Sequence, residues 1–172
     1  MEAPRQKLEP PDSHYLRAAE GWLELGLLAE SAAELDEISP AHQRHPDVLE
    51  LRCALDIQRA RWDAALDAAR KLVSIAPSRV SGWLHQSFAM RRVTDGGVAK
   101  AMEALMPAAE KFPKDPTVSY NLSCYACQLR KYDEARFWLR RAFQIGNKEH
   151  VKRIALADPD LKPLWEEIRQ LG

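Results

Sequence analysis

Two cysteines, Cys124 and Cys127, stand three residues apart and form the pair whose types and spacing could do chemistry. Such a pair can act as a redox dithiol or supply half of a zinc site. The sequence has no second Cys-x-x-Cys and no His-x-x-x-His, and the pair lies in the middle of a predicted helix. We therefore expect the thiols to pack between helices and expect no metal or cofactor, although a redox or metal role stays open.

Other patterns typical of catalysis are missing from the sequence. It contains no glycine-rich phosphate loop, no Gly-x-Ser-x-Gly and no His-Glu-x-x-His. The histidines do not fall at spacings typical of metal ligands or catalytic groups; they are His14, His42, His45, His85 and His150. We expect no catalytic residue and predict that the protein is not an enzyme.

The composition excludes several classes of partner. The chain has 172 residues, of which 29% are charged, with 25 basic residues against 25 acidic ones. A balanced charge argues against nucleic acid and against an anionic membrane surface as partners. No apolar run approaches the roughly 18 to 20 residues of a membrane span, and residues 1–13 have no signal-peptide core. Three cysteines, an odd count, do not suggest a secreted disulfide framework, so a cytoplasmic location is expected.

Small residues recur along the chain at a nearly fixed interval. One series has spacings of 34, 34 and 36, and consists of Ala19, Cys53, Ser87 and Ser123. A second series has spacings of 34, 36 and 34, and consists of Ser31, Ala65, Ala101 and Ala135. Because the two extra residues fall between Ser87 and Ala101, one insertion explains both irregularities. The insertion predicts an enlarged turn at residues 94–97, where the sequence reads Thr-Asp-Gly-Gly.

Each repeated unit also shows the periodicity of an amphipathic helix. In the last unit the apolar positions fall at i, i+4, i+7 and i+8, which is one face of a helix, and are Ala135, Leu139, Ala142 and Phe143. Prolines follow the second predicted helix of the first three units, at Pro40, Pro77 and Pro113. With only 7 glycines in the chain, these features predict an all-α fold of antiparallel helix pairs.

The residues of these units resemble tetratricopeptide repeats. The stretch YNLSCYACQLRKYDEARFWLRRAFQIG, residues 120–146, is similar to a nearly complete repeat, and RWDAALDAARKLVSIAP, residues 61–77, resembles the second half of another. The resemblance implies a right-handed α-solenoid with repeats at about 12–45, 46–79, 80–115 and 116–146. Before them, residues 1–11 are expected to be disordered. After them, residues 147–172 are expected to form C-terminal capping helices.

In this family the first helix of each repeat lines a concave groove. The resemblance therefore implies a protein-binding groove formed by Leu16, Arg17, Glu20, Glu50, Leu51, Ala54, Leu84, His85, Phe88, Arg91, Arg92, Tyr120, Asn121 and Cys124. Asp47 belongs to the wider set of positions on these helices. The surface grades from acidic in the first repeats to basic and amide-bearing in the later ones. This implies an interaction module or scaffold that holds a peptide or helical segment of another protein.

Two alternatives remain open at the level of the sequence. Small tetratricopeptide chaperones for exported client proteins are similar in length and repeat content, although they typically carry three repeats. Convex or terminal surfaces could instead join two copies of the chain into a homodimer. A co-purifying secreted client would favour the chaperone, and light scattering over a concentration series would reveal the dimer.

Overall fold

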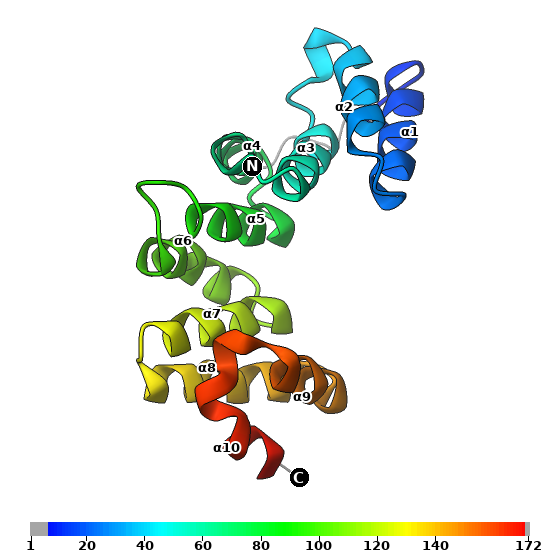
Figure 1. The fold of residues 1–172 in the computed structure, drawn as a ribbon. Helices are drawn as coiled ribbons and strands as arrows, with labels where there is room; N and C mark the ends of the chain where they lie inside the picture. Colours follow the sequence, from blue (N-terminus) through cyan, green and yellow to red (C-terminus); the bar gives the residue numbers. More distant parts are fainter. Residues whose placement is uncertain (1–6, 171–172) are drawn as a thin grey trace. The chain divides into compact units, whose positions relative to one another are not determined.

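The computed structural model describes residues 7–170, and within that range it contains helices and no strand (Figure 1). The chain divides into two compact units, residues 1–93 and 94–172. The boundary between the units falls inside the third predicted repeat. Each unit has its own packed helices, so the all-α fold class is confirmed for each of them.

The first unit is built from antiparallel helices that pack in chain order. Its elements are α1 (Asp12–Glu24), α2 (Leu28–Glu37), the 3-10 helix η1 (Pro40–His42), α3 (Pro46–Gln58), α4 (Trp62–Ile75) and α5 (Val80–Met90). Besides these sequential contacts, α1 packs on α3 and α3 packs on α5. The first helices of successive repeats therefore form one continuous face, which is the face that the resemblance assigns to partner binding.

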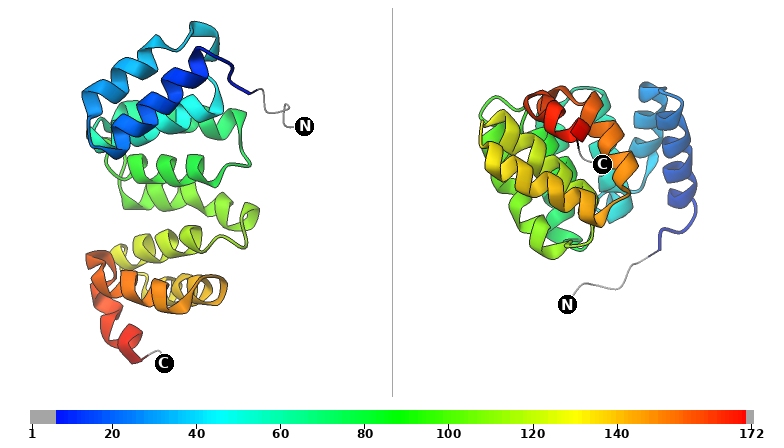
Figure 2. Two further views of the ribbon diagram at one scale, coloured as in Figure 1. Left: turned by 90° about the vertical axis from the view of Figure 1, so that its right-hand side faces the viewer. Right: turned by 90° about the horizontal axis from the view of Figure 1, so that it is seen from below.

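The second unit contains the remaining repeat helices and a folded C-terminal segment. Its elements are α6 (Val98–Lys111), α7 (Pro116–Gln128), α8 (Tyr132–Ile145), α9 (Lys148–Ala157), the 3-10 helix η2 (Pro159–Leu164) and α10 (Trp165–Gln170). After α9 packs on α8, the chain turns back so that η2 lies against α7, as Figure 2 shows in its left view.

The same turn joins the two helices in three of the repeats. It closes with a backbone hydrogen bond from the third turn residue to the carbonyl five positions earlier, for example from Arg61 N to Asp56 O at 2.8 Å. The second turn residue has a positive φ, which is +74° at Gly26, +54° at Ala60 and +59° at Arg130. Only the glycine adopts this conformation without a steric penalty.

The third connection is longer, as the spacing predicts. Seven residues, 91–97, separate α5 from α6, whereas three separate the helices of the other repeats. The connection ends at Gly97, whose φ of +115° excludes most other residues. The predicted enlarged turn at 94–97 is therefore confirmed.

Small residues of the two repeating series meet between paired helices. The Ser31 hydroxyl donates to the carbonyl of Ala19 at 2.9 Å, and the Ser123 hydroxyl donates to the carbonyl of Ala135 at 2.9 Å. All four residues are fully buried, so each hydroxyl satisfies its hydrogen-bonding capacity while the helices approach closely. A close approach between paired helices is the physical reason for the small residues that revealed the repeat.

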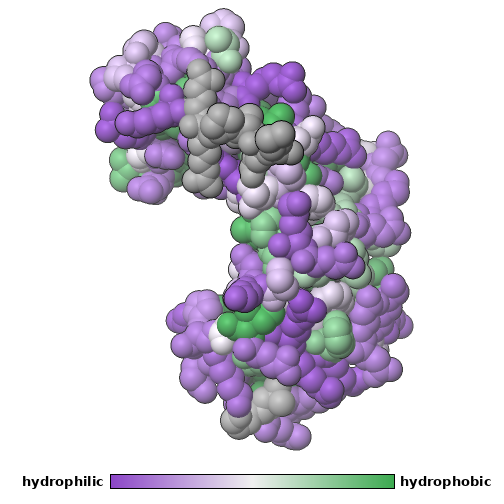
Figure 3. Space-filling view, turned by 180° about the vertical axis from the view of Figure 1, so that it is seen from behind, coloured by the Kyte–Doolittle hydropathy of each residue, from purple (hydrophilic) through white to green (hydrophobic). Residues whose placement is uncertain are grey.

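The face of the molecule drawn in Figure 3 is largely polar. Hydrophilic residues cover most of the face seen in Figure 3, and hydrophobic residues appear there as small separate areas. Among the described residues, no helix combines the length and the apolar character that crossing a membrane would require.

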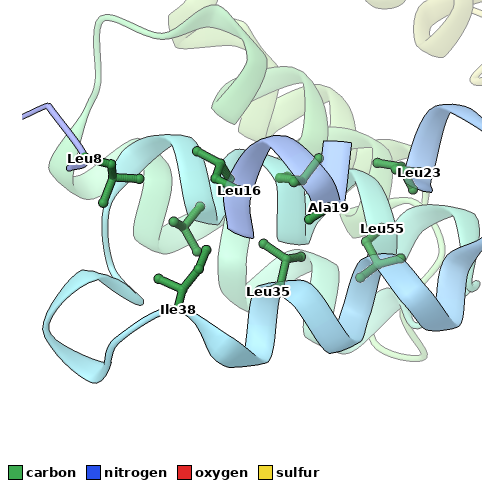
Figure 4. Close-up of a cluster of buried hydrophobic side chains, with 9 residues drawn as sticks. Leu8, Leu16, Ala19, Leu23, Leu35, Ile38 and Leu55 are labelled. Carbon is green, nitrogen blue, oxygen red and sulfur yellow. The ribbon is translucent and has the colours of Figure 1, made fainter. Parts of the chain in front are cut away.

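The core of the first unit reaches further toward the N-terminus than the sequence predicts. Leu8 is 5% exposed and packs with Leu16 and Ile38 (Figure 4). The expected disordered segment through residue 11 is therefore wrong for its last part, because a leucine on the first helix pair gains free energy from burial. The earlier part of that segment, residues 1–6, lies outside the described residues.

Candidate functional site

A hollow of about 430 Å³ opens on the face formed by α1, α3 and α5 in the first unit. It is lined by Leu16, Glu20, Asp47, Glu50, Leu51, Ala54 and His85. Six of these belong to the groove that the sequence predicts, and Asp47 belongs to its wider set. Residues separated by up to 69 positions thus come together because the first helices of three repeats lie side by side.

The floor of the hollow is apolar and its walls are acidic. Leu16 and Leu51 are 8% and 9% exposed, so they present only a small part of their surface to the hollow. Arg79, at the start of α5, closes the acidic wall, since its guanidinium contacts Asp47 Oδ1 at 2.5 Å and Glu50 Oε2 at 2.9 Å. Those two carboxylates share a single guanidinium, which leaves the wall with excess negative charge.

Glu20 is the carboxylate of the hollow that has no cationic partner among the described residues. Glu20 is exposed, but the neighbouring residues remove part of its hydration and so raise its pKa, and the negative charges of Asp47, Glu24 and Glu50 raise it further. A raised pKa means that the ionised form of this carboxylate is less stable here than in water. A cation placed beside Glu20 would relieve that cost.

His85 lines the same hollow and has a buried polar atom without a partner among residues 7–170. Its Nδ1 atom is buried and has no hydrogen-bond partner within the described part of the chain. Burial lowers the pKa of the His85 imidazole from its ordinary value, which favours the neutral form. The imidazole therefore does not offset the negative charge of the carboxylates.

The C-terminal half of α5 and the residues just after it carry a second set of predicted groove residues, some of which also pack within the fold. The Arg92 guanidinium lies 3.6 Å from the centre of the Phe88 ring and 5.1 Å from that of Trp62. The Phe88 and Trp62 rings pack at 6.2 Å, so this aromatic pair joins α5 to α4. Phe88 and Arg92 therefore contribute to the fold of the first unit as well as to its surface.

The remaining predicted groove residues of the first unit do not line the hollow. Arg17 is exposed on α1 and donates from Nε to the carbonyl of Ser13 at 3.2 Å. Leu84 and Arg91 are half-buried on and just after α5. In this unit, the predicted groove residues that line the hollow are therefore those at the acidic end of the predicted groove.

In the second unit the predicted groove is covered by the chain's own C-terminal segment. Tyr120 donates from its hydroxyl to Asp158 Oδ2 at 2.8 Å, and the thiol of Cys124 contacts the same oxygen at 3.5 Å. Cys124 is 4% exposed, so the prediction that it lines an open groove is wrong. Asn121 stays half-buried on α7 and donates to the carbonyl of Thr117 at 2.8 Å.

The three cysteines are buried thiols. Burial raises the pKa of Cys53 to about 12 and also raises the pKa values of Cys124 and Cys127. A raised pKa suppresses the thiolate, which is the reactive and metal-binding form. No group of three or more His, Cys, Asp or Glu residues that could hold a metal ion occurs in residues 7–170.

Two structural features of these surfaces have no signal in the sequence. Arg79 stands in the connection between two repeats, and nothing in its neighbours indicates that it reaches back to α3. A hollow of about 400 Å³ on α8, lined by residues including Phe137, Arg140 and Arg141, also lies away from the first-helix face. Phe137 is 56% exposed there, which a search confined to first helices misses.

Comparison with solved structures identifies the fold as that of tetratricopeptide-repeat proteins. A thermophilic tetratricopeptide protein of Thermus thermophilus, TTC0263, aligns with a TM-score of 0.72 and 17% identity over 91% of this chain and 82% of its own. MamA RS-1, as a double mutant, aligns with a TM-score of 0.69 and 14% identity over 88% and 80%. MamA AMB-1 aligns with a TM-score of 0.65 and 18% identity over 93% and 91%.

Comparisons at the level of the sequence give no match. No protein-family model matches it, and no curated protein matches it significantly. The structural likeness therefore shows the fold, which the spacing of small residues and the resemblance to the repeat both predict.

Proposed function

We propose that this protein is a non-enzymatic interaction module that holds a segment of a partner protein on the first-helix face of its first unit. The observation that carries the proposal is the hollow, which brings six predicted groove residues from α1, α3 and α5 into one concave surface. Concave surfaces with an apolar floor and a few convergent polar groups are the usual sites of ligand binding.

The dimensions of the hollow suit side chains of a partner. A volume of about 430 Å³ accommodates a few side chains, and the packed helices around it supply a rigid frame. The first unit is the favoured location because the first helix of the fourth repeat is covered by the C-terminal segment. A partner would meet backbone that is already ordered, which reduces the entropic cost of association.

A random-peptide library selected on the full chain tests this function. Ala54→Gln keeps the charge and helix propensity of α3 while it fills the hollow. Ala33→Gln makes the same change on the exposed surface of α2 and serves as the matched control.

We expect peptides that bind the natural chain and the Ala33→Gln control but lose most of their affinity for Ala54→Gln. Circular dichroism should show the same helix content for all three chains. Failure to select any peptide, or equal binding by Ala54→Gln, would place partner binding elsewhere and overturn the proposal.

A further inference from the structure

We infer that the hollow of the first unit selects a partner segment bearing lysine or arginine, whose aliphatic stem lies on Leu16 and Leu51 while its cationic head binds Glu20. This inference rests on the function proposed above for the same surface. It adds the chemistry of the occupant, which neither the fold nor the comparisons supply.

The first argument is charge. Three carboxylates line the hollow. His45 Nδ1 lies 3.6 Å from Asp47 Oδ2, and the arginine that pairs with these carboxylates is Arg79. It contacts Asp47 and Glu50, so Glu20 remains without a cationic partner. Glu20 is exposed, so a cationic head can reach it from solvent, and binding beside it would complete the ion pairing of the hollow.

The second argument is the combination of surfaces in one hollow. Leu16, Leu51 and Ala54 provide apolar contacts on the floor, while the carboxylates stand on the walls. Lysine and arginine have long aliphatic stems that end in a charge, so they match an apolar floor with an acidic wall. A purely apolar side chain would leave Glu20 without a partner and would cost its desolvation.

The third argument is the charge of His85, which lines the hollow. Its Nδ1 atom is buried and lacks a hydrogen-bond partner within the described part of the chain. Burial lowers the pKa of the imidazole, which favours its neutral form. His85 therefore supplies no positive charge that would compete with a cationic occupant for the carboxylates.

Two other occupants suit the hollow less well. A bound metal ion would require three or more convergent ligand groups, and residues 7–170 provide no such group. An acidic partner segment would add negative charge to a wall where the carboxylates already raise the pKa of Glu20 by mutual repulsion. The observations therefore favour a basic segment of a protein.

The peptides selected on the full chain provide the test. We expect lysine or arginine to be enriched among them relative to the unselected library. A synthetic copy of a selected peptide is then titrated into the natural chain, Glu20→Gln and Glu30→Gln by fluorescence anisotropy. Glu30 is an exposed carboxylate on α2, outside the hollow, and is the matched control.

Glu20→Gln should weaken binding of the basic peptide by about tenfold, because it removes a charge-assisted hydrogen bond, while Glu30→Gln should leave binding unchanged. Replacing the peptide's basic residue with methionine should produce the same loss and abolish the effect of Glu20→Gln. Added salt should weaken the natural pair more than the neutral one.

Other results would overturn the inference in distinguishable ways. Selected peptides that lose affinity for Ala54→Gln but carry no excess of basic residues would refute the basic occupant. They would still support the proposed function as an interaction module. Equal affinity of Glu20→Gln and the natural chain would do the same. Self-association by light scattering that Glu20→Gln removes would assign the hollow to a second copy of the chain.

Discussion

The hydroxyl of Tyr120 donates a hydrogen bond of 2.8 Å to Oδ2 of Asp158, a residue 38 positions further along the chain. This bond joins α7 to the segment that leads from α9 into η2. Nearby, the Gln128 amide donates to Oδ1 of Asp160. The C-terminal segment is therefore held on the first helix of the fourth repeat by specific polar contacts as well as by apolar packing.

A double-mutant cycle should measure the coupling of this pair. Tyr120→Phe removes the donor hydroxyl, and Asp158→Asn replaces the charged acceptor with a neutral amide. Their effects on the free energy of unfolding should be less than additive by about 1 to 2 kcal/mol. Urea unfolding of the two single variants and the double variant gives the coupling. Additive effects would show that the contact contributes nothing to stability.

Leu161 should be the main apolar anchor of the C-terminal segment. It is fully buried in η2, whereas the adjacent Lys162 is exposed. Leu161→Ala should lower the free energy of unfolding by about 2 to 5 kcal/mol, because it removes buried methyl groups and leaves a cavity. Lys162→Ala, measured by the same urea titration, should change it by less than about 0.5 kcal/mol. Similar effects of the two changes would mean that the segment is not docked.

The sequence predicts the repeat register and the insertion because both depend on local constraints. Ser31 and Ser123 must be small to fit between two helices, and a fixed interval between such positions is visible without a structure. The position of the C-terminal segment is a different matter. It depends on whether residues far apart in the sequence, such as Tyr120 and Asp158, meet, and no periodicity encodes that contact.

The candidate site was predictable to a similar degree. Glu20, Glu50 and His85 follow from placing first helices side by side, which the repeat implies. The contact of Arg79 with two carboxylates depends on side-chain conformations in a connection, so the sequence does not reveal it. The burial of Cys124 agrees with the expectation that the thiols pack between helices, whereas its contact with Asp158 depends on where the C-terminal segment lies and is not visible in the sequence.

Ala60→Gly should stabilise the chain. Ala60 has a φ of +54°, a conformation that glycine adopts without the steric cost that a Cβ atom imposes. We expect a gain of up to about 1 kcal/mol in the free energy of unfolding. Arg70→Gly, at an exposed position inside α4, should instead cost about 1 kcal/mol. Thermal unfolding of the two variants should therefore shift in opposite directions, and a common direction would contradict the role of the turn.

Acid should weaken the first unit through Asp12. The buried carboxylate accepts hydrogen bonds from the Ser39 hydroxyl at 2.5 Å and the Ser39 N–H at 3.0 Å, and it contacts His42 Nδ1 at 2.5 Å. These contacts, those of Ser39 first, lower the pKa of Asp12 from 3.8 to about 2. The native state therefore binds this proton less readily than the unfolded state does.

The contribution of Asp12 should be complete above about pH 4 and should disappear as the pH falls toward about 2. Asp12→Asn should lower stability at pH 7 and flatten its dependence on pH within that window. Asp63→Asn, which changes an exposed residue in the first turn of α4, should leave the slope unchanged. Urea midpoints at several values between pH 2 and pH 5 test this, and parallel curves for all three chains would refute it.

The thiols should be protected by the fold. Because burial raises the pKa of Cys53 to about 12 from 9.0, its thiolate population falls on the order of a thousandfold. An aromatic disulfide reagent at pH 8 should react with all three cysteines at once in guanidinium chloride, but only slowly in the folded chain. A rapidly reacting thiol in the folded chain would reopen a redox role for Cys124 and Cys127.

The folded tail also bears on how such a protein can lengthen. A fifth repeat added after Ile145 would have to place its first helix against α7 and α8, as α3 lies against α1 and α2. Those positions are taken by η2 and α9. A further repeat at this end would therefore have to displace η2 from α7 and α9 from α8.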